Sequence, residues 1–189
     1  MGLDVFIIRG YRSDSEMEEA RRRAEEDGEE IPSEFKPVTW RHCQQWGDFP
    51  FTPTTEEISE YDRDEQYVGS HPSPRFIGEI TGPMYIDFGC LSFRGRGYSD
   101  LAGIIGLPYS FYGALSAEQV AEQTEMLGKW LASATGPDGQ PIMERLTWRG
   151  HEDPEANERW LRSDFQRLQH LHTLLSWMVK HHLETYASF

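Results

Sequence analysis

The chain has 189 residues, of which 32 are acidic and 18 are lysine or arginine, so its formal net charge is −14. This charge disfavours direct binding to nucleic-acid phosphates or to an anionic membrane, and no apolar run is long enough to cross a bilayer. Aromatic residues make up 13% of the chain, enough buried surface to offset the entropy of folding, which excludes a disordered protein. No secretory signal is recognised, and Cys43 and Cys90 are too few for a disulfide framework, so we expect a cytoplasmic location.

The first predicted element is a β-strand over residues 3–8. Large apolar side chains occupy both faces of this run, with Val5 and Ile7 on one face and Phe6 and Ile8 on the other. Such a pattern is typical of a central strand that is covered on both sides.

Residues 13–67 form a predicted acidic insert. Its first part is a predicted helix, because Ser13 and Glu16 make a capping box and Arg22 and Glu26 are one of several oppositely charged pairs spaced i,i+4. The apolar stripe of this helix is short, so we expect it to project into solvent.

The second part of the insert is rich in proline and aromatic residues. Four prolines in residues 31–53 exclude a long helix there. We expect one short strand at Val38–Cys43, a loop whose aromatic side chains cover the core, and a second acidic helix that begins near Thr54.

Negative charge is concentrated in this insert. Residues 13–30 hold nine acids against three arginines, and residues 56–65 hold six acids against one arginine, giving net charges of −6 and −5. Residues 75–115 are balanced. The pattern predicts an electrically neutral body with two acidic segments, which serve either a basic partner or simple solubility.

Two further strands are predicted at Arg75–Thr81 and Met84–Phe93, joined by a tight connection at Gly82-Pro83. The glycine-rich stretch Arg94–Asp100 is predicted to be a turn, with Ser99 as the cap of a short helix at Leu101–Ile105.

Two long helices complete the chain. Ser116 and Gln119 form a capping box at the start of one, and Asp153 caps the other. We expect the last helix to continue to Tyr186, with Trp160 on its apolar face. The elements together predict a single-domain α+β fold over residues 1–189: a small, mostly antiparallel sheet packed against two long helices, with an acidic helical insert.

The Arg94–Asp100 turn is a candidate anion-binding site through Arg94, Arg96 and Ser99. Backbone N–H groups at a helix start and two guanidinium groups suit a phosphate or a carboxylate. The alternative is a tight turn whose arginines pair with the protein's own acids.

The histidines do not predict a metal site. His170 and His172 lie two residues apart and diverge on a helix, as do the adjacent His181 and His182, and we expect His172 and His182 on the apolar face. A metal would need distant ligands such as His42, Cys43 or His71, so we predict neither a metal nor a cofactor.

Two residues of the last helix stand out. Asp164 falls on its apolar face, where an arginine from the Arg94–Asp100 turn is a plausible partner. With Asp87 it could instead form a carboxylate pair for acid–base chemistry. Trp177 points away from the apolar face and marks either an interface or packing beneath the proline-rich loop.

Three short pieces carry a resemblance: the opening Met-Gly-Leu-Asp, the stretch Phe93–Asp100 and the run Leu171–Trp177. In these the chain resembles a loose group of small phage and prophage proteins, over about 20 residues. It departs from the group in its long acidic insert and in the spacing from Leu171-His172 to Trp177. The resemblance implies a phage-linked origin more than an activity.

The leading interpretation is a non-enzymatic, phage-encoded accessory protein that binds a basic or nucleic-acid-binding host protein by acidic charge mimicry, in the host cytoplasm. An enzyme or small-anion binder using Arg94, Arg96 and Asp87 or Asp164 is one alternative, and an oligomeric virion or assembly component is the other. The candidate partner-binding residues are Glu18, Glu19, Glu25, Glu26, Glu56, Glu57, Glu60 and Trp177.

Overall fold

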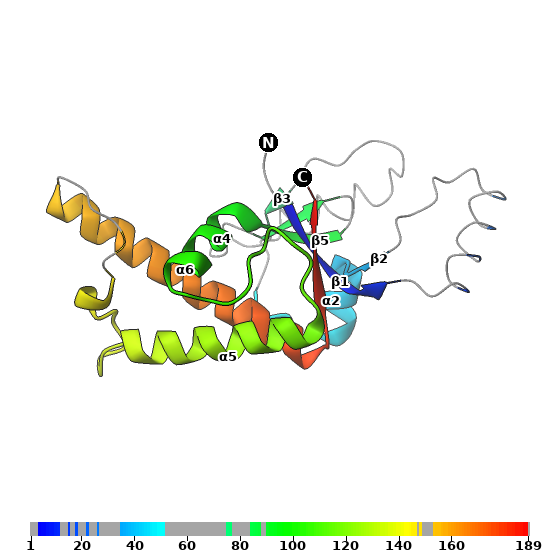
Figure 1. The fold of residues 1–189 in the computed structure, drawn as a ribbon. Coiled ribbons are helices and arrows are strands. Elements are labelled where there is room, and N and C mark those ends of the chain that lie inside the picture. Colours follow the sequence, from blue (N-terminus) through cyan, green and yellow to red (C-terminus); the bar gives the residue numbers. More distant parts are fainter. Residues whose placement is uncertain are drawn as a thin grey trace.

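The computed structural model describes residues 4–11, 15, 18, 22, 26, 35–51, 75–76, 84–87, 90–146, 148 and 153–188. Its strands are β1 (Asp4–Tyr11), β2 (Phe35–Pro37), β3 (Arg75–Phe76), β4 (Met84–Asp87), β5 (Cys90–Arg94) and β6 (Glu184–Ser188). Its helices are α2 (Trp40–Trp46), α4 (Gly95–Ile104), α5 (Ala117–Ala134) and α6 (Pro154–Lys180), with one 3-10 turn, η1 (Met143–Arg145). Figure 1 shows the helices beside the sheet, which confirms the predicted α+β class.

Strand β1 is the centre of the sheet, as its two apolar faces predicted. The strands are antiparallel in the order β2-β1-β5-β4-β3, and β6 also pairs with β1. The first residues of β1 bond to β5 on one side and to β6 on the other, and its far end bonds to β2. Val5, Ile7 and Ile8 are fully buried, and Val5 and Ile7 belong to the hydrophobic core.

The predicted strand at Val38–Cys43 is largely wrong. Strand β2 ends at Pro37, Val38 continues the backbone pairing for one residue, and the chain then turns into helix α2. Thr39 is the N-cap of this helix, and its backbone N–H donates to Nδ1 of His42 at 3.0 Å, as in a capping box. Because a histidine stands where glutamate or glutamine is usual, the sequence pattern did not predict the helix.

The predicted strand Met84–Phe93 is two strands. β4 and β5 pair antiparallel, with Asp87 opposite Cys90, so the chain reverses between these two residues. β3 also pairs with β4, but only over Arg75 and Phe76. The reversal between β4 and β5 was not predicted, whereas the predicted connection at Gly82-Pro83, between β3 and β4, lies outside the described residues.

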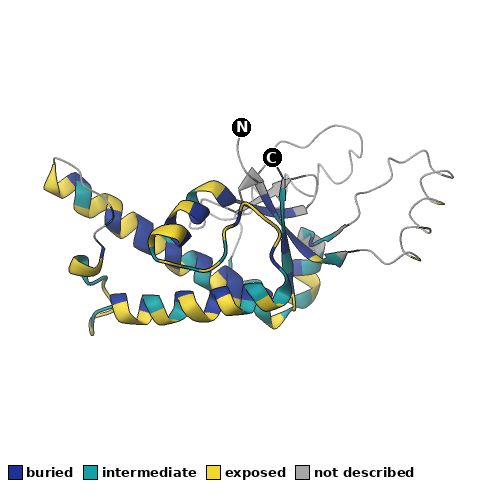
Figure 2. Cartoon of the chain, in the orientation of Figure 1, coloured by how far each residue is buried: buried dark blue, intermediate teal, exposed yellow. Residues whose placement is uncertain are grey.

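Helices α5 and α6 run side by side, and one end of the pair lies at the sheet (Figure 1), where α5 contacts β6; Figure 2 shows buried and exposed residues interspersed along both helices. Helix α5 begins as predicted: Ser116 Oγ accepts from the Gln119 N–H at 3.3 Å, and the Gln119 side chain accepts from the Ser116 N–H at 3.0 Å. Asp153 caps α6 by accepting from the Glu155 N–H at 3.0 Å. These caps satisfy backbone donors that the first helical turn leaves free.

Helix α6 is shorter than predicted. It ends at Lys180, His182 takes a left-handed φ of 51°, and the chain returns as strand β6. Thr185 is buried there and accepts a hydrogen bond from the Leu115 N–H through Oγ1 at 3.1 Å. The pairing of residues 184–188 with β1 is therefore more stable than a continuation of helix α6. At the other end Trp160, predicted on the apolar face, is 52% exposed.

The core lies between the sheet and α4, α5 and α6. Phe93 of β5 makes edge contacts with Tyr98 of α4 and with Phe111, at ring-centroid distances of 5.8 and 5.4 Å. All three side chains are buried. Across the part of the chain that the structure describes, no helix has the length and apolar character needed to span a membrane.

We predict that Ser116→Ala lowers the free energy of unfolding by about 1 kcal/mol, because it removes a side-chain acceptor for the first turn of α5. Ser133, an exposed serine of the same helix, is the matched control. Ser133→Ala should change the free energy by less than about 0.5 kcal/mol. Urea unfolding monitored by circular dichroism measures both, and equal effects would contradict the capping role.

Candidate functional site

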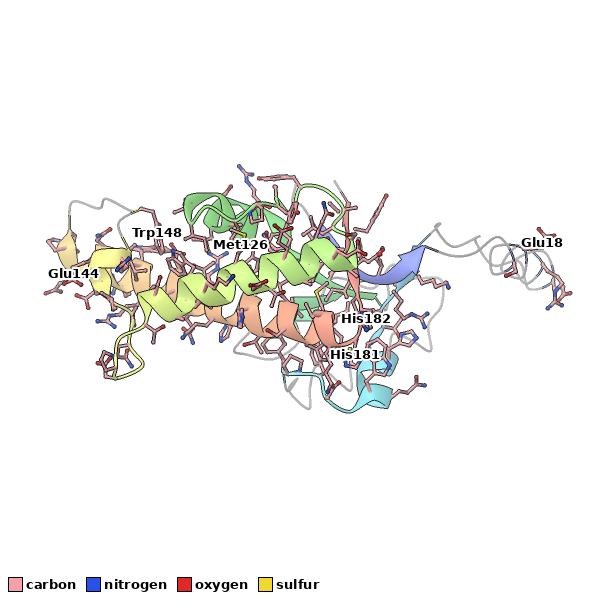
Figure 3. The ribbon with its side chains drawn as sticks, turned by 60° about the horizontal axis from the view of Figure 1, so that its bottom comes forward. Glu18, Met126, Glu144, Trp148, His181 and His182 are labelled. Atoms are coloured by element: carbon pink, nitrogen blue, oxygen red, sulfur yellow. The ribbon has the colours of Figure 1, made fainter. Side chains whose placement is uncertain are left out.

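The predicted partner-binding acids are described in part. Glu18 and Glu26 are exposed, and Figure 3 shows Glu18 well away from helices α5 and α6. Arg22 Nη1 donates to Glu26 Oε1 at 3.2 Å, which confirms the predicted i,i+4 pair. Five of the predicted residues lie outside the described part of the chain: Glu19, Glu25, Glu56, Glu57 and Glu60.

The predicted anion-binding turn is the beginning of helix α4. The helix starts at Gly95, so Ser99 lies within it and is buried, and the prediction that Ser99 caps a later helix is wrong. Arg96 is exposed in the first turn. The side chains of Arg94 and Asp87 lie outside the described residues, so the structure places only one of the two arginines of this candidate site.

Asp164 is buried, as its position on the apolar face predicted, and an arginine of its own helix lies beside it. Arg167 Nη1 lies 3.5 Å from Asp164 Oδ1, and Trp148 Nε1 donates to Oδ2 at 3.3 Å. The Arg167 guanidinium also lies over the Tyr98 ring at 5.3 Å. A Cβ at Gly97 would overlap this guanidinium, so the glycine leaves room for the arginine between α4 and α6.

The histidines of α6 pack against different neighbours. His172 is half-buried and lies against Gly128 of α5, and His170 makes an edge contact with Phe51. Burial lowers the pKa of both imidazoles. His182, predicted on the apolar face, is exposed because α6 has already ended. Among the described residues, no three His, Cys, Asp or Glu side chains group as metal ligands.

Trp177 is buried, with 4% of its surface exposed, so it does not form an exposed interface. The predicted alternative, packing beneath the proline-rich loop, is confirmed. Its ring makes an edge contact with Phe49 at 5.1 Å and a tilted contact with Trp46 at 5.6 Å. The indole therefore anchors residues 46–49 against the end of α6.

The strongest cluster of polar and aromatic side chains surrounds Asp48. Its carboxylate accepts hydrogen bonds from Trp177 Nε1 at 3.1 Å and from His181 Nε2, which lies 2.9 and 3.0 Å from the two oxygens. Lys180 Nζ also donates to the carboxylate. These three donors come from the last residues of α6 and its cap, whereas Asp48 follows α2, so one carboxylate joins two distant parts of the chain.

Aromatic rings flank this carboxylate. Trp46 stacks on His181 with a centroid distance of 4.4 Å and an interplanar angle of 15°. Phe49 and Phe51 extend this group of rings and make an edge contact with each other, with their ring centroids 5.5 Å apart. Figure 3 shows His181 at the end of α6, next to α2. We call Trp46, Asp48, Trp177, Lys180 and His181, with Phe49, the Asp48 cluster.

Charge and burial shift two pKa values in and beside the cluster. Hydrogen bonding from Lys180, with His181 and Trp177, lowers the pKa of Asp48 to about 2, so the group stays ionised at neutral pH. Burial raises the pKa of the nearby Cys43 thiol to about 12, and the charge of Asp48 adds to this shift. Cys43 is therefore a buried, unreactive thiol.

The sequence offered only weak signals for the Asp48 cluster. The aromatic residues of 46–51 predicted cover for the core, and the outward direction of Trp177 predicted a contact outside the apolar stripe. Nothing in the spacing joined Asp48 to Lys180 and His181, because the contact depends on where α6 ends.

Comparisons of the chain with protein-family models, with curated proteins and with solved structures find no match.

We predict that Arg167→Met destabilises the protein by about 1–2 kcal/mol, because it removes a charged partner from the buried Asp164. Arg162 is the matched control: it lies on the same helix and pairs with Glu158 on the surface. Arg162→Met should change stability by about 0.5 kcal/mol or less. Chemical unfolding of both variants measures the difference, and equal losses would contradict a role for Arg167 in satisfying Asp164.

We predict that Asp48→Asn lowers the melting temperature by a few degrees at pH 7 and flattens its decline with acid. The pKa of Asp48 is depressed to about 2, so its contribution is present above about pH 4 and is lost as pH falls from about 4 to 2. Thermal unfolding from pH 7 to pH 2 measures this, and a decline as steep as in the wild type would refute it.

Cys43 gives an independent readout of the same variant. In a Cys90→Ser background, loosening of the Asp48 cluster should expose Cys43 and accelerate its reaction with a disulfide reagent at pH 8. Asp138→Asn, on an exposed turn, is the control and should leave the rate unchanged. An unchanged rate in Asp48→Asn would mean that the cluster does not hold α2 in place.

Proposed function

We propose that the protein is a non-enzymatic binding protein whose acidic segments recognise a basic host protein, such as one that binds nucleic acid. The proposal rests on one observation above the others: Glu18 and Glu26 are exposed, and Glu18 lies well away from helices α5 and α6 (Figure 3). Acids presented in this way attract a cationic surface over a distance of about one Debye length.

The distribution of charge supports this role. Residues 13–30 and 56–65 together carry −11 of the net −14, while the rest of the chain is close to neutral. Arg22 is the cation that pairs with Glu26, and it belongs to the same acidic segment.

Charge mimicry gives the proposal a specific form. A surface that binds DNA or RNA carries lysines and arginines that replace counterions along the phosphates. Carboxylates on a projecting segment can take the place of those phosphates, so the protein and a nucleic acid would compete for one partner surface. The weak resemblance to phage proteins suits a host partner of this kind.

A small-anion binder is the second candidate, and one observation favours it. The first turn of α4 holds Arg96 and no acidic residue, and the Arg167 guanidinium lies against Gly97 in the same turn. Helix N-termini attract anions, and two guanidinium groups add to that attraction. Asp164 gives little support to a catalytic role at this site, because it is buried and already bonded to Arg167 and Trp148. The burial of Trp177 likewise removes the residue on which an assembly role rested.

We predict that replacing Glu18, Glu19, Glu25 and Glu26 with glutamine slows association with a basic partner by about tenfold at low salt. Partners captured from a host lysate at low salt provide the binding target. Surface plasmon resonance at increasing sodium chloride concentration measures the rate. The matched control replaces four acids of the body, Glu118, Glu122, Glu144 and Glu155, which are all exposed, and should have a much smaller effect.

A competition experiment distinguishes charge mimicry from general electrostatic attraction. Double-stranded DNA should displace the protein from its partner, and both should fail to bind at once. Binding that is indifferent to salt, or a ternary complex with DNA, would overturn the proposal.

A further inference from the structure

The Asp48 carboxylate is held at the surface by two donors that cannot move easily and by one that can. Trp177 is buried and the side chain of His181 is 16% exposed, and each donates a ring N–H to the carboxylate. Lys180 is the third donor, and its side chain is 65% exposed. Asp48 itself is 26% exposed. Its position is therefore set by the two rings, while its open side faces a flexible lysine.

Exchange of this lysine for another cation involves little loss of stability. Pairs between an exposed lysine and a carboxylate contribute little, because solvent screens the charges and the long side chain loses entropy. Removing Lys180 from the carboxylate leaves the hydrogen bonds from Trp177 and His181 in place. The anchoring of residues 46–49 also keeps its ring contacts, including Phe49 with Trp177.

The rings beside the carboxylate favour a flat cation. Trp46 stacks nearly parallel on His181, and Phe49 follows Asp48 directly in the chain; both aromatic side chains are partly exposed. A guanidinium group pairs with a carboxylate through two parallel N–H donors and stacks on aromatic faces. It is also less strongly hydrated than an ammonium group, so its transfer from water to this cluster is easier.

We propose that the Asp48 cluster is a binding site for the guanidinium group of an arginine, and that Lys180 occupies this site when no ligand is bound. The arginine displaces Lys180 and pairs with Asp48 beside Trp46. The arginine belongs to a basic partner protein. Only this assignment of the arginine to a partner rests on the proposed function. The site would fix one residue of a partner that the acidic segments attract from a distance.

The test uses N-acetyl-arginine methylamide as the probe and the full-length protein at low salt. The Trp177 indole N–H signal, assigned with Trp177→Phe, reports binding in an NMR titration because it is bonded to Asp48. Lys180→Ala should bind the probe about fivefold more tightly than the wild type, since the internal competitor is gone. Lys129→Ala, which removes another exposed lysine from an i,i+4 pair with Glu125, should not change the affinity.

Two further arms define the ligand. N-acetyl-lysine methylamide should bind more weakly than the arginine probe, and a glycine-flanked arginine peptide should bind at least as tightly as the free derivative. Asp48→Asn should abolish binding, with circular dichroism and a cooperative thermal unfolding transition used to verify that the variant is folded. If Asp48→Asn does not fold, Trp46→Leu takes its place and should weaken binding.

Equal affinity of Lys180→Ala and wild type, or equal affinity for the arginine and lysine probes, would overturn the inference. Its failure can be told apart from failure of the proposed function. The glutamine variant of residues 18–26 should bind the arginine probe normally, because those residues are not part of the cluster. Salt-dependent partner binding without arginine binding would leave the proposed function intact and remove the Asp48 site.

Discussion

The Asp48 carboxylate is the contact that ties the first part of the chain to the last. It lies just after α2 and accepts hydrogen bonds from side chains at the end of α6, so it fixes a loop segment onto a helix terminus. Two of its donors are ring N–H groups with defined directions, and stacked rings flank them. The same end of the molecule holds the buried Cys43 and the ring contacts of Trp46 and Phe49 with Trp177.

Local signals predicted the parts of the fold that local physics controls. The capping residues Ser116 and Asp153 mark the starts of α5 and α6 because they satisfy the free N–H groups of a first turn, whatever the rest of the chain does. The doubly apolar run of β1 likewise predicted a strand covered on both faces, and Ile7 and Ile8 are fully buried. Each of these features is decided within a few residues.

Other parts depend on contacts that no window of sequence contains. The helical pattern of α6 continues to Tyr186 in the sequence, but the last residues pair with β1 instead, and Thr185 finds a buried backbone partner at Leu115. The end of that helix then decides where Lys180 and His181 meet Asp48. The position of the Asp48 cluster depends on where α6 ends. Sequence analysis therefore missed both the helix end and the cluster. Asp164 has Arg167 of its own helix beside it, whereas the side chain of Arg94, from the turn that was predicted to supply its partner, lies outside the described residues.

The pairing of β1 with β6 has a consequence for how the molecule forms. Asp4 bonds opposite Ser188, so the middle of the sheet brings together residues from the two extremes of the described chain. Contacts of such long sequence separation slow folding, because a large loop must close before they form. Until residues 184–188 pair with it, β1 presents an unpaired apolar edge on this side. Such an edge in an incompletely folded chain favours aggregation and binding by chaperones.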